Sequence, residues 1–139
     1  MVESISIHPR YSGPKRVHFD VALLHMIEDF NLEKNIDTIC LPEFPDRTEG
    51  NYDSQDCHIM GWGVDTFESQ QYSVILKQAK LPIVQNNQCQ NLLRNTRLSN
   101  TFKLHGSFLC AGGGKQDACK GDGGGPLICS DSRDSNRYV

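Results

Sequence analysis

Six cysteines are spread along a chain of 139 residues, and no two of them form a close C-x-x-C pair. They are Cys40, Cys57, Cys89, Cys110, Cys119 and Cys129. Structural zinc sites take their ligands in closely spaced pairs, whereas scattered cysteines are typical of disulfides. The spacing therefore predicts disulfides, an extracellular environment and no metal site. It does not choose among the many pairings that six cysteines allow.

Length and composition exclude several classes of partner. Hydrophobic residues make up 37% of the chain and charged residues 22%, which is typical of a globular protein with a modest core. The net charge is −3, and no Lys/Arg cluster follows one face in the sequence, so nothing indicates nucleic acid binding. The longest apolar stretches, at 21–24 and 74–76, fall far short of the about 20 residues that span a bilayer. We therefore expect neither nucleic acid nor a membrane as a partner.

The N-terminal half carries three predicted strands. Residues 2–8 alternate in polarity and end at a proline, which predicts the first strand. Residues 19–24 form a short apolar run with one acid, Asp20, embedded in it. We expect this strand to be buried, and a buried carboxylate needs partners to offset its desolvation. Residues 57–63 predict a third strand, which finishes in Gly-Trp-Gly.

Further along the chain, residues 72–84 show the near alternation of a long strand, broken late by Pro82. Asn86 or Asn87 is suited to cap a short helix that follows. Short strands are predicted at 108–111 and at 126–129.

Two features complete this pattern. In the predicted helix, Cys89, Leu92 and Leu93 share one face, and the cysteine is placed to pin the helix to the rest of the protein. The last ten residues, 130–139, are polar and predict no element.

Glycines dominate residues 112–125, and such a run alone is typical of a surface loop. A phosphate-binding loop is excluded because Gln116 stands where Ser or Thr is needed to hold magnesium. A calcium loop is excluded because Asp117 and Asp122 lack the alternating acids and closing glutamate of that motif.

The segment 121–127 reads Gly-Asp-Gly-Gly-Gly-Pro-Leu and resembles the signature around the nucleophile of trypsin-like (S1) serine proteases, whose third position is serine.

Four more features occur in the order of that family. They are Phe-Asp-Val-Ala-Leu-Leu at 19–24, Cys-Leu-Pro at 40–42, Gly-Trp-Gly at 61–63 and Phe-Leu-Cys-Ala-Gly at 108–112. Within the family, residues 119–124 and 91–98 look most like the clip-domain serine protease homologues of arthropods, in which glycine replaces the nucleophile. The resemblance implies an all-β fold, a trypsin-like double β-barrel with one short helix.

We expect residues 1–139 to be a partial peptidase S1 domain. By the resemblance, it holds mostly the second barrel and a strand segment of the first. The histidine-bearing N-terminal part and the C-terminal strands and helix are not among these residues.

Peptide hydrolysis in this family needs a serine nucleophile, a histidine base and a buried aspartate that orients the histidine. By resemblance, Asp20 is the vestigial triad acid, and Gly123 occupies the nucleophile position. Glycine has no side-chain oxygen, so no acyl-enzyme can form there. None of the five histidines follows a small residue and precedes a cysteine, as the catalytic base does. We expect all five to be surface or loop residues, namely His8, His18, His25, His58 and His105.

The resemblance also assigns roles around Gly123. Gly121 supplies the oxyanion-type amide. Asp122 is the acid that pairs with a newly cleaved N-terminus in active relatives, so here we expect it to find another partner or to stay solvated. Asp117 matches the base of the primary specificity pocket, where an aspartate recognises Arg or Lys. An exposed loop acid is the alternative for Asp117.

The resemblance further implies two disulfides, Cys57–Cys129 and Cys89–Cys110. Cys40 and Cys119 are then expected to be unpaired in this fragment.

The leading hypothesis is a non-catalytic serine protease homologue that acts as a binding cofactor or adaptor in an extracellular proteolytic cascade. The clip-domain resemblance implies prophenoloxidase activation and innate immunity, with proteases or zymogens as partners and no cofactor. The alternatives are an active trypsin-like endopeptidase, a zinc or redox protein, and a truncated gene product without a function of its own. Residues 1–5 lack the features of a signal peptide, so secretion is expected of the full-length protein.

Overall fold

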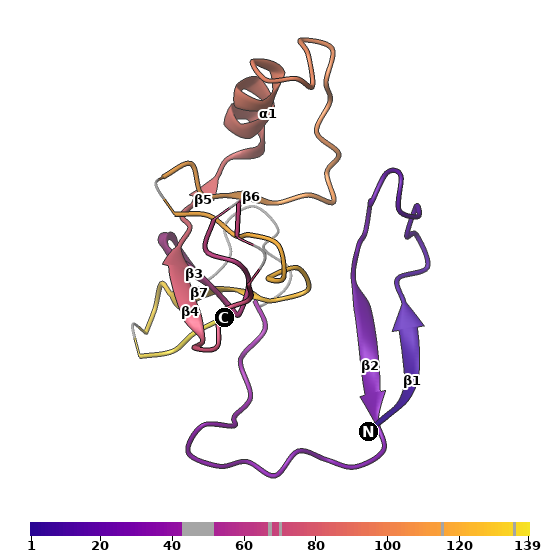
Figure 1. Cartoon of the computed structure of the whole chain (residues 1–139), viewed down its shortest axis with the longest axis vertical. Helices are drawn as coiled ribbons and strands as arrows, with labels where there is room; N and C mark the ends of the chain where they lie inside the picture. Colours follow the sequence, from indigo (N-terminus) through magenta and orange to yellow (C-terminus); the bar gives the residue numbers. More distant parts are fainter. Residues whose placement is uncertain (43–51, 67, 70, 115, 135) are drawn as a thin grey trace. The chain divides into compact units, whose positions relative to one another are not determined.

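The computed structural model of the chain describes residues 1–42, 52–66, 68–69, 71–114, 116–134 and 136–139. The chain folds as two compact units, whose elements are labelled in Figure 1. The first unit consists of Met1–Thr38 and Asn86–Leu109, and the second of Ile39–Gln85 and Cys110–Val139. Strands predominate, with one short helix, and within the described residues the small sheets do not close into a barrel.

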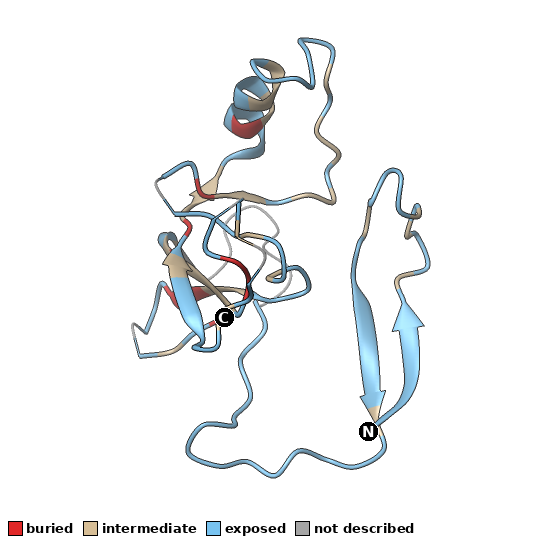
Figure 2. Ribbon diagram, in the orientation of Figure 1, coloured by how far each residue is buried: buried red, intermediate tan, exposed pale blue. Residues whose placement is uncertain are grey.

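A two-stranded antiparallel hairpin forms the N-terminal part of the first unit. Strand β1 (Val2–Ile7) pairs with β2 (Ala22–Met26), and Ile5 lies opposite Leu24. An isolated pair of strands has no third layer against which to bury a face. Its apolar side chains are accordingly exposed, and Figure 2 shows the hairpin almost entirely in pale blue.

The expectation of a buried strand at 19–24 is wrong. The strand begins only at Ala22, because the chain bends before it: Val17 and Phe19 have positive φ angles of 49° and 55°. Such left-handed backbone interrupts an extended strand. Asp20 is exposed, so its carboxylate is not the buried acid that the sequence predicts.

The helix of the first unit, α1 (Asn86–Arg94), starts at the asparagine pair expected to cap it. The Asn86 side chain donates a hydrogen bond to the carbonyl oxygen of Phe108 at 3.2 Å. At the other end, Arg94 Nε donates to the carbonyl oxygen of Phe102 at 2.9 Å. Cys89 is buried, whereas Leu92 is 55% exposed, so the shared face is only partly covered.

The second unit is built on a three-stranded antiparallel sheet of order β4-β3-β7. Its strands are β3 (Tyr52–Gly61), β4 (Lys77–Lys80) and β7 (Leu127–Asp131). A second, two-stranded antiparallel sheet consists of β5 (Ile83–Val84) and β6 (Cys110–Ala111).

Residues 72–84 are therefore not one long strand. The stretch divides into β4 and β5, and its first residues form a bend in which Ser73 N donates to the carbonyl oxygen of Trp62 at 3.0 Å. The Ser73 hydroxyl also donates to the carbonyl oxygen of Ile75 at 2.6 Å. These local bonds replace the ladder bonds that a strand would need.

The core of the second unit surrounds the centre of β3 and β7. Cys57 has no exposed surface, and Cys129, which lies opposite it in the sheet, is 5% exposed. Leu81, Val64 and Val139 complete this small core. Figure 2 shows buried residues in red on the strands of this unit. The red segment on α1 belongs to the first unit.

The C-terminal segment pairs with β7, a contact that the polar sequence of 130–139 does not reveal. The backbones of Cys129 and Val139 exchange two hydrogen bonds, at 2.8 and 2.9 Å. Asp131 N donates to the carbonyl oxygen of Arg137 at 2.8 Å. The Asp131 side chain is only 1% exposed and contacts the guanidinium groups of Arg133 and Arg137.

Candidate functional site

The glycine-rich loop that precedes β7 is anchored by a disulfide on the adjacent strands. Cys57 of β3 and Cys129 of β7 form this bond, which joins the two cysteines that the family resemblance pairs. Cys89 and Cys110 are disulfide-bonded as well. Cys40 and Cys119 are free thiols.

The carboxylate of Asp122 organises the loop. Its Oδ1 accepts a hydrogen bond from the backbone amide of Gly63 at 2.8 Å, and its Oδ2 accepts one from the amide of Cys119 at 2.9 Å. Val64 N donates to the carbonyl oxygen of Lys120 at 3.0 Å, which ties the same two segments together a second time. Of the two outcomes expected for Asp122, the structure shows the one in which it finds another partner.

Two glycines make this close approach of the carboxylate possible. A Cβ atom at Gly63 would lie 2.5 Å from Asp122 Oδ1, and one at Gly61 would collide with the same oxygen. No side chain can occupy these positions unless the aspartate moves. The two glycines of the Gly-Trp-Gly sequence at the end of β3 therefore leave the space that the Asp122 carboxylate occupies.

Backbone conformation also restricts the loop itself. Gly121 has a φ of +101° and Gly124 a φ of +89°, which side-chain-bearing residues rarely adopt. The ring of Tyr72 covers Gly121, because a Cβ there would lie 2.6 Å from Tyr72 Cε1. The alternation at 72–84 predicts a strand through Tyr72 and does not reveal this contact. An aromatic residue in a polar stretch was the available signal.

Gly123, the nucleophile position by resemblance, is sterically free. No atom outside its immediate neighbours lies within 4 Å of a Cβ built on it, and its φ is not in the left-handed region. The backbone therefore accepts a side chain here, so no packing constraint in the described residues requires glycine. What glycine removes is the hydroxyl oxygen, and with it any nucleophile at this point of the loop.

Asp117 lines a pocket of about 250 Å³ in the second unit, together with Asp122, Gln116, Gly61 and Lys77. Asp117 itself is exposed, and its Oδ1 accepts a hydrogen bond from the amide of Ala118 at 2.8 Å. The lining includes a third acid, Asp65, whose carboxylate forms an ion pair with Lys77 at 2.5 Å. The pocket is thus acidic apart from this one neutralised pair, which suits a cationic side chain.

The acid that the resemblance assigns to the triad, Asp20, belongs to the first unit. Asp20 is exposed and lies two residues before the first residue of β2, whereas Gly121 and Gly123 belong to the second unit.

Three of the histidines gather with aromatic rings in the first unit. His18 stacks on His105 with ring centroids 3.8 Å apart, and His8 stacks on Phe19 at 5.0 Å. Partial burial, the neighbouring His105 and the charge of Arg16 all lower the pKa of His18 below 6.5. His18 and His105 lie in loops, as expected, yet they pack against each other rather than standing free.

His58 contradicts the expectation of a surface or loop position, because it is half-buried within β3. Its Nε2 lies 3.3 Å from Asp56 Oδ1, and Lys80 Nζ lies 3.0 Å from the same oxygen. Ser130 Oγ donates to Asp56 Oδ2 at 2.5 Å. Hydrogen bonds from Ser130, Lys80 and His58, in that order, lower the pKa of Asp56 from 3.8 to about 2.

This cluster is not among the sites predicted from the sequence. Alternation along a strand places Asp56 and His58 on one face of β3, which is the signal that was available. The cluster joins β3 to both of its neighbours, since Lys80 comes from β4 and Ser130 from β7.

The described residues contain no group of three or more His, Cys, Asp or Glu side chains placed to hold a metal ion. Their single helix is too short to cross a bilayer.

Comparison with known proteins gives a consistent set of relatives. The family model described as Trypsin matches residues 1–137. Phenoloxidase-activating factor 2 of Galleria mellonella is 42% identical over 123 residues, which is 87% of this chain and 40% of that protein. Inactive CLIP domain-containing serine protease A8 of Anopheles gambiae is 38% identical over 137 residues, or 98% of this chain and 36% of the relative.

A third relative, inactive CLIP domain-containing serine protease A28 of Anopheles gambiae, is 36% identical over 139 residues. The match takes in 99% of this chain and 34% of the relative. The chain therefore spans well under half the length of the relatives it matches.

Proposed function

The chain belongs to the trypsin family, and from that premise we propose that it is a serine protease homologue that binds partner proteins without cleaving them. One observation carries the proposal. Gly123 follows Asp122, whose carboxylate accepts a backbone hydrogen bond. A side chain at position 123 would meet open space, so the backbone would accept serine there. Glycine, however, has no side-chain oxygen that could attack a peptide. The loop is present and organised, and its nucleophile is missing.

The size of the catalytic loss supports a non-catalytic role. Removing the serine nucleophile from a protease triad lowers kcat by about a million-fold. The rate that remains comes from substrate binding and the oxyanion hole, and it exceeds the uncatalysed rate by only ~10³–10⁴. Among residues 1–139, no histidine follows a small residue and precedes a cysteine, which is the setting of the family's base.

For the fold, we propose the double β-barrel of trypsin-like proteases, of which residues 1–139 contribute part of one peptidase domain. The family match over residues 1–137 supports this. The β4-β3-β7 sheet would belong to one barrel, and β1 and β2 to the other. The exposed apolar side chains of the hairpin, such as Ile5 and Leu24, fit strands that other strands cover.

The proposed biological role is that of a cofactor or adaptor in an extracellular proteolytic cascade of the prophenoloxidase-activating type. The names of the relatives support it, since one is a phenoloxidase-activating factor and others are inactive CLIP-domain proteins. The disulfides support an oxidising, extracellular location. Its partners would be proteases or zymogens of the cascade.

Asp117 is the residue that we propose for partner recognition. It lines the acidic pocket, where an exposed carboxylate can pair with an Arg or Lys side chain presented by a partner. Binding of this kind needs no nucleophile.

A reconstituted cascade tests the role directly. The chain is added to a zymogen protease and prophenoloxidase, and the rate of phenoloxidase activation is measured. In parallel, the chain alone is tested for hydrolysis of a peptide whose scissile bond follows an arginine. We expect faster activation and no hydrolysis, with a smaller acceleration for an Asp117→Asn variant. Hydrolysis by the unaltered chain would establish the endopeptidase alternative instead, and an unchanged activation rate would overturn the cofactor role.

A further inference from the structure

Two stretches of the first unit contain no acidic residue. In residues 4–19 the charged side chains are Arg10, Lys15 and Arg16, and in Asn86–Leu109 they are Arg94, Arg97 and Lys103. The chain as a whole carries 17 acidic residues against 14 basic ones, so all of its acids lie outside these two stretches. The charge of the protein is therefore strongly segregated along the sequence.

Ring and backbone contacts join these two stretches. His18 stacks on His105 at 3.8 Å, and the Phe19 ring meets the edge of the His105 ring at 5.3 Å. The backbone amide of Phe19 donates to Ser107 Oγ at 3.1 Å. No basic cluster is apparent in the sequence, because residues 20–85 separate the two stretches along the chain.

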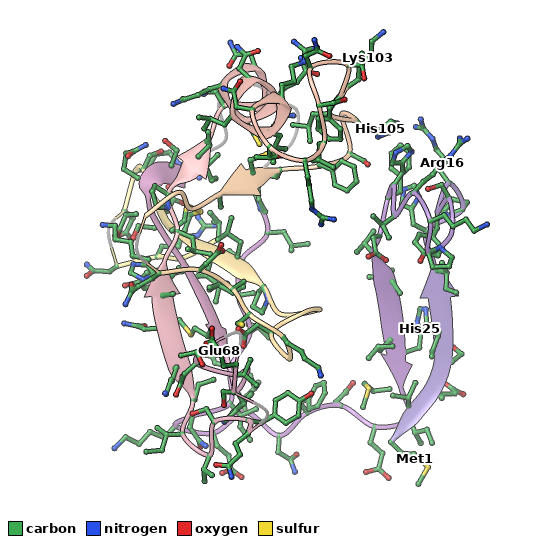
Figure 3. All side chains as sticks on the ribbon, turned by 45° about the horizontal axis from the view of Figure 1, so that its top comes forward. Met1, Arg16, His25, Glu68, Lys103 and His105 are labelled. Atoms are coloured by element: carbon green, nitrogen blue, oxygen red, sulfur yellow. A yellow bond between two sulfur atoms is a disulfide. The ribbon has the colours of Figure 1, made fainter. Side chains whose placement is uncertain are left out.

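The basic side chains are distributed around this junction. The Arg10 guanidinium lies 4.2 Å from the centre of the Phe19 ring, and Arg16 is close enough to His18 to lower its pKa. Arg94 is held by the carbonyl of Phe102, next to Lys103. Figure 3 labels Arg16, Lys103 and His105 on this part of the first unit.

The charges of this surface are not neutralised within the described part of the chain. Arg10, Lys15, Arg16, Arg97 and Lys103 are exposed, and Arg94 is half-buried. The ion pairs of the described residues use other cations, namely His58, Lys77, Lys80, Arg133 and Arg137.

We propose that this basic patch, made of Arg10, Lys15, Arg16, Arg94, Arg97 and Lys103, binds a sulfated polysaccharide. A surface with several exposed cations that form no ion pair among the described residues attracts a polymer that presents a repeating negative charge. Arginine supplies planar, forked donors that match the oxygens of an oxyanion, which suits sulfate groups. The disulfides indicate an oxidising environment, which favours an extracellular polysaccharide over a nucleic acid.

The patch is independent of the glycine at position 123 and of the acidic pocket, which belong to the second unit. A failed cascade experiment would leave this proposal standing, and the reverse also holds.

Binding of a fluorescent, size-defined heparin oligosaccharide to the full chain provides the test. The test variant is Arg16→Ser/Lys103→Ser, which removes two exposed cations of the patch. The matched control is Lys34→Ser/Lys120→Ser, which removes two exposed cations elsewhere and changes the net charge equally. Thermal unfolding followed by circular dichroism checks that both variants remain folded.

We expect the patch variant to bind about 25-fold more weakly, because each of the two basic residues removed contributes about a fivefold factor near a polyanionic surface. Its affinity should also depend less steeply on salt, since fewer counterions are released. The control should bind like the unaltered chain. An equal loss in both variants, or no binding at low salt, would overturn the proposal.

Competition experiments test the chemistry of the ligand. Unsulfated hyaluronan should not displace the heparin oligosaccharide, because it lacks sulfate groups. Displacement by hyaluronan, or by a DNA duplex at equal charge concentration, would contradict a site for sulfated polysaccharide.

Discussion

The carboxylate of Asp122 accepts a hydrogen bond from the backbone amide of Gly63 at 2.8 Å, and this bond joins the end of β3 to the glycine-rich loop. Its other oxygen accepts a hydrogen bond from the backbone amide of Cys119 at 2.9 Å, so both oxygens have backbone donors. In active relatives, the resemblance implies, a newly cleaved N-terminus pairs with this acid. Here the backbone of the second unit supplies the partners, and the loop is organised without an incoming amino group.

This arrangement predicts that Gly63→Ala destabilises the protein. The new Cβ would lie 2.5 Å from Asp122 Oδ1 and would displace the carboxylate from its donors. We expect a loss of about 1–3 kcal/mol in the free energy of unfolding, as for other overpacked sites. Urea unfolding measures it, with Gly123→Ala as the control because its Cβ meets open space. Equal stability of the two variants would show that Asp122 does not require Gly63.

Much of the fold could be predicted where local pattern and packing agree. The alternation at 2–8 marks β1, and the asparagine pair marks the start of α1. The bend at Ser73 was not predictable, because apolar alternation from Tyr72 onward does not reveal hydrogen bonds to Trp62. Likewise, polar residues 130–139 looked unstructured because their partner, β7, lies in a separate predicted element.

The site shows the same division. The motif placed Gly121, Asp122 and Gly123 together in one loop, because they are consecutive in the chain. The Asp56 cluster was missed because its members come from three strands, and only the folded sheet brings Ser130 beside Asp56. Long-range polar contacts of this kind leave no local pattern in the sequence.

The Asp56 cluster predicts an acid-dependent contribution to stability. The folded pKa of about 2 lies below the ordinary 3.8, so protonation favours the unfolded state. The contribution is therefore present above pH 3.8 and is lost as the pH falls toward 2. Ser130→Ala removes the largest cause of the lowered pKa, so stability should vary less with pH in this window. Urea midpoints measured across the window test this.

Ser132→Ala is the matched control, because Ser132 is exposed and is not among the groups that shift the pKa of Asp56. It should retain the pH dependence of the unaltered chain. The assignment fails if the Ser130→Ala variant retains it too.

The His18–His105 stack predicts an acid-sensitive junction in the first unit. Partial burial comes first among the causes that lower the pKa of His18 below 6.5, followed by the charges of His105 and Arg16. Because the folded pKa is lowered, His18 destabilises the fold when protonated, and stability declines as the pH falls below 6.5. NMR titration should give a midpoint for His18 below 6.5.

A His105→Phe variant should raise that midpoint, because it removes one of the repelling charges. His25→Phe serves as the control, since His25 is exposed and bonds Ser6 instead. An unchanged His18 midpoint in His105→Phe would argue against the stacked pair.

The acidic pocket predicts weak binding of a planar cation. Benzamidine, an amidinium compound, should bind the chain, and Asp117→Asn should weaken the binding about tenfold through loss of a charge-assisted hydrogen bond. Calorimetric titration measures both. Asp20→Asn, an exposed acid of the first unit, should leave the affinity unchanged. A similar loss in both variants would mean that benzamidine responds to net charge rather than to the pocket.

Reaction with a labelled fluorophosphonate tests the central claim most directly, because the reagent modifies the activated serine of a serine protease. An active trypsin labelled in parallel shows that the reagent works. The account predicts no label on the chain, since Gly123 has no hydroxyl group, and none on Gly123→Ser, since the sequence has no histidine in the setting of the family's base. Stoichiometric labelling of the unaltered chain would contradict the account.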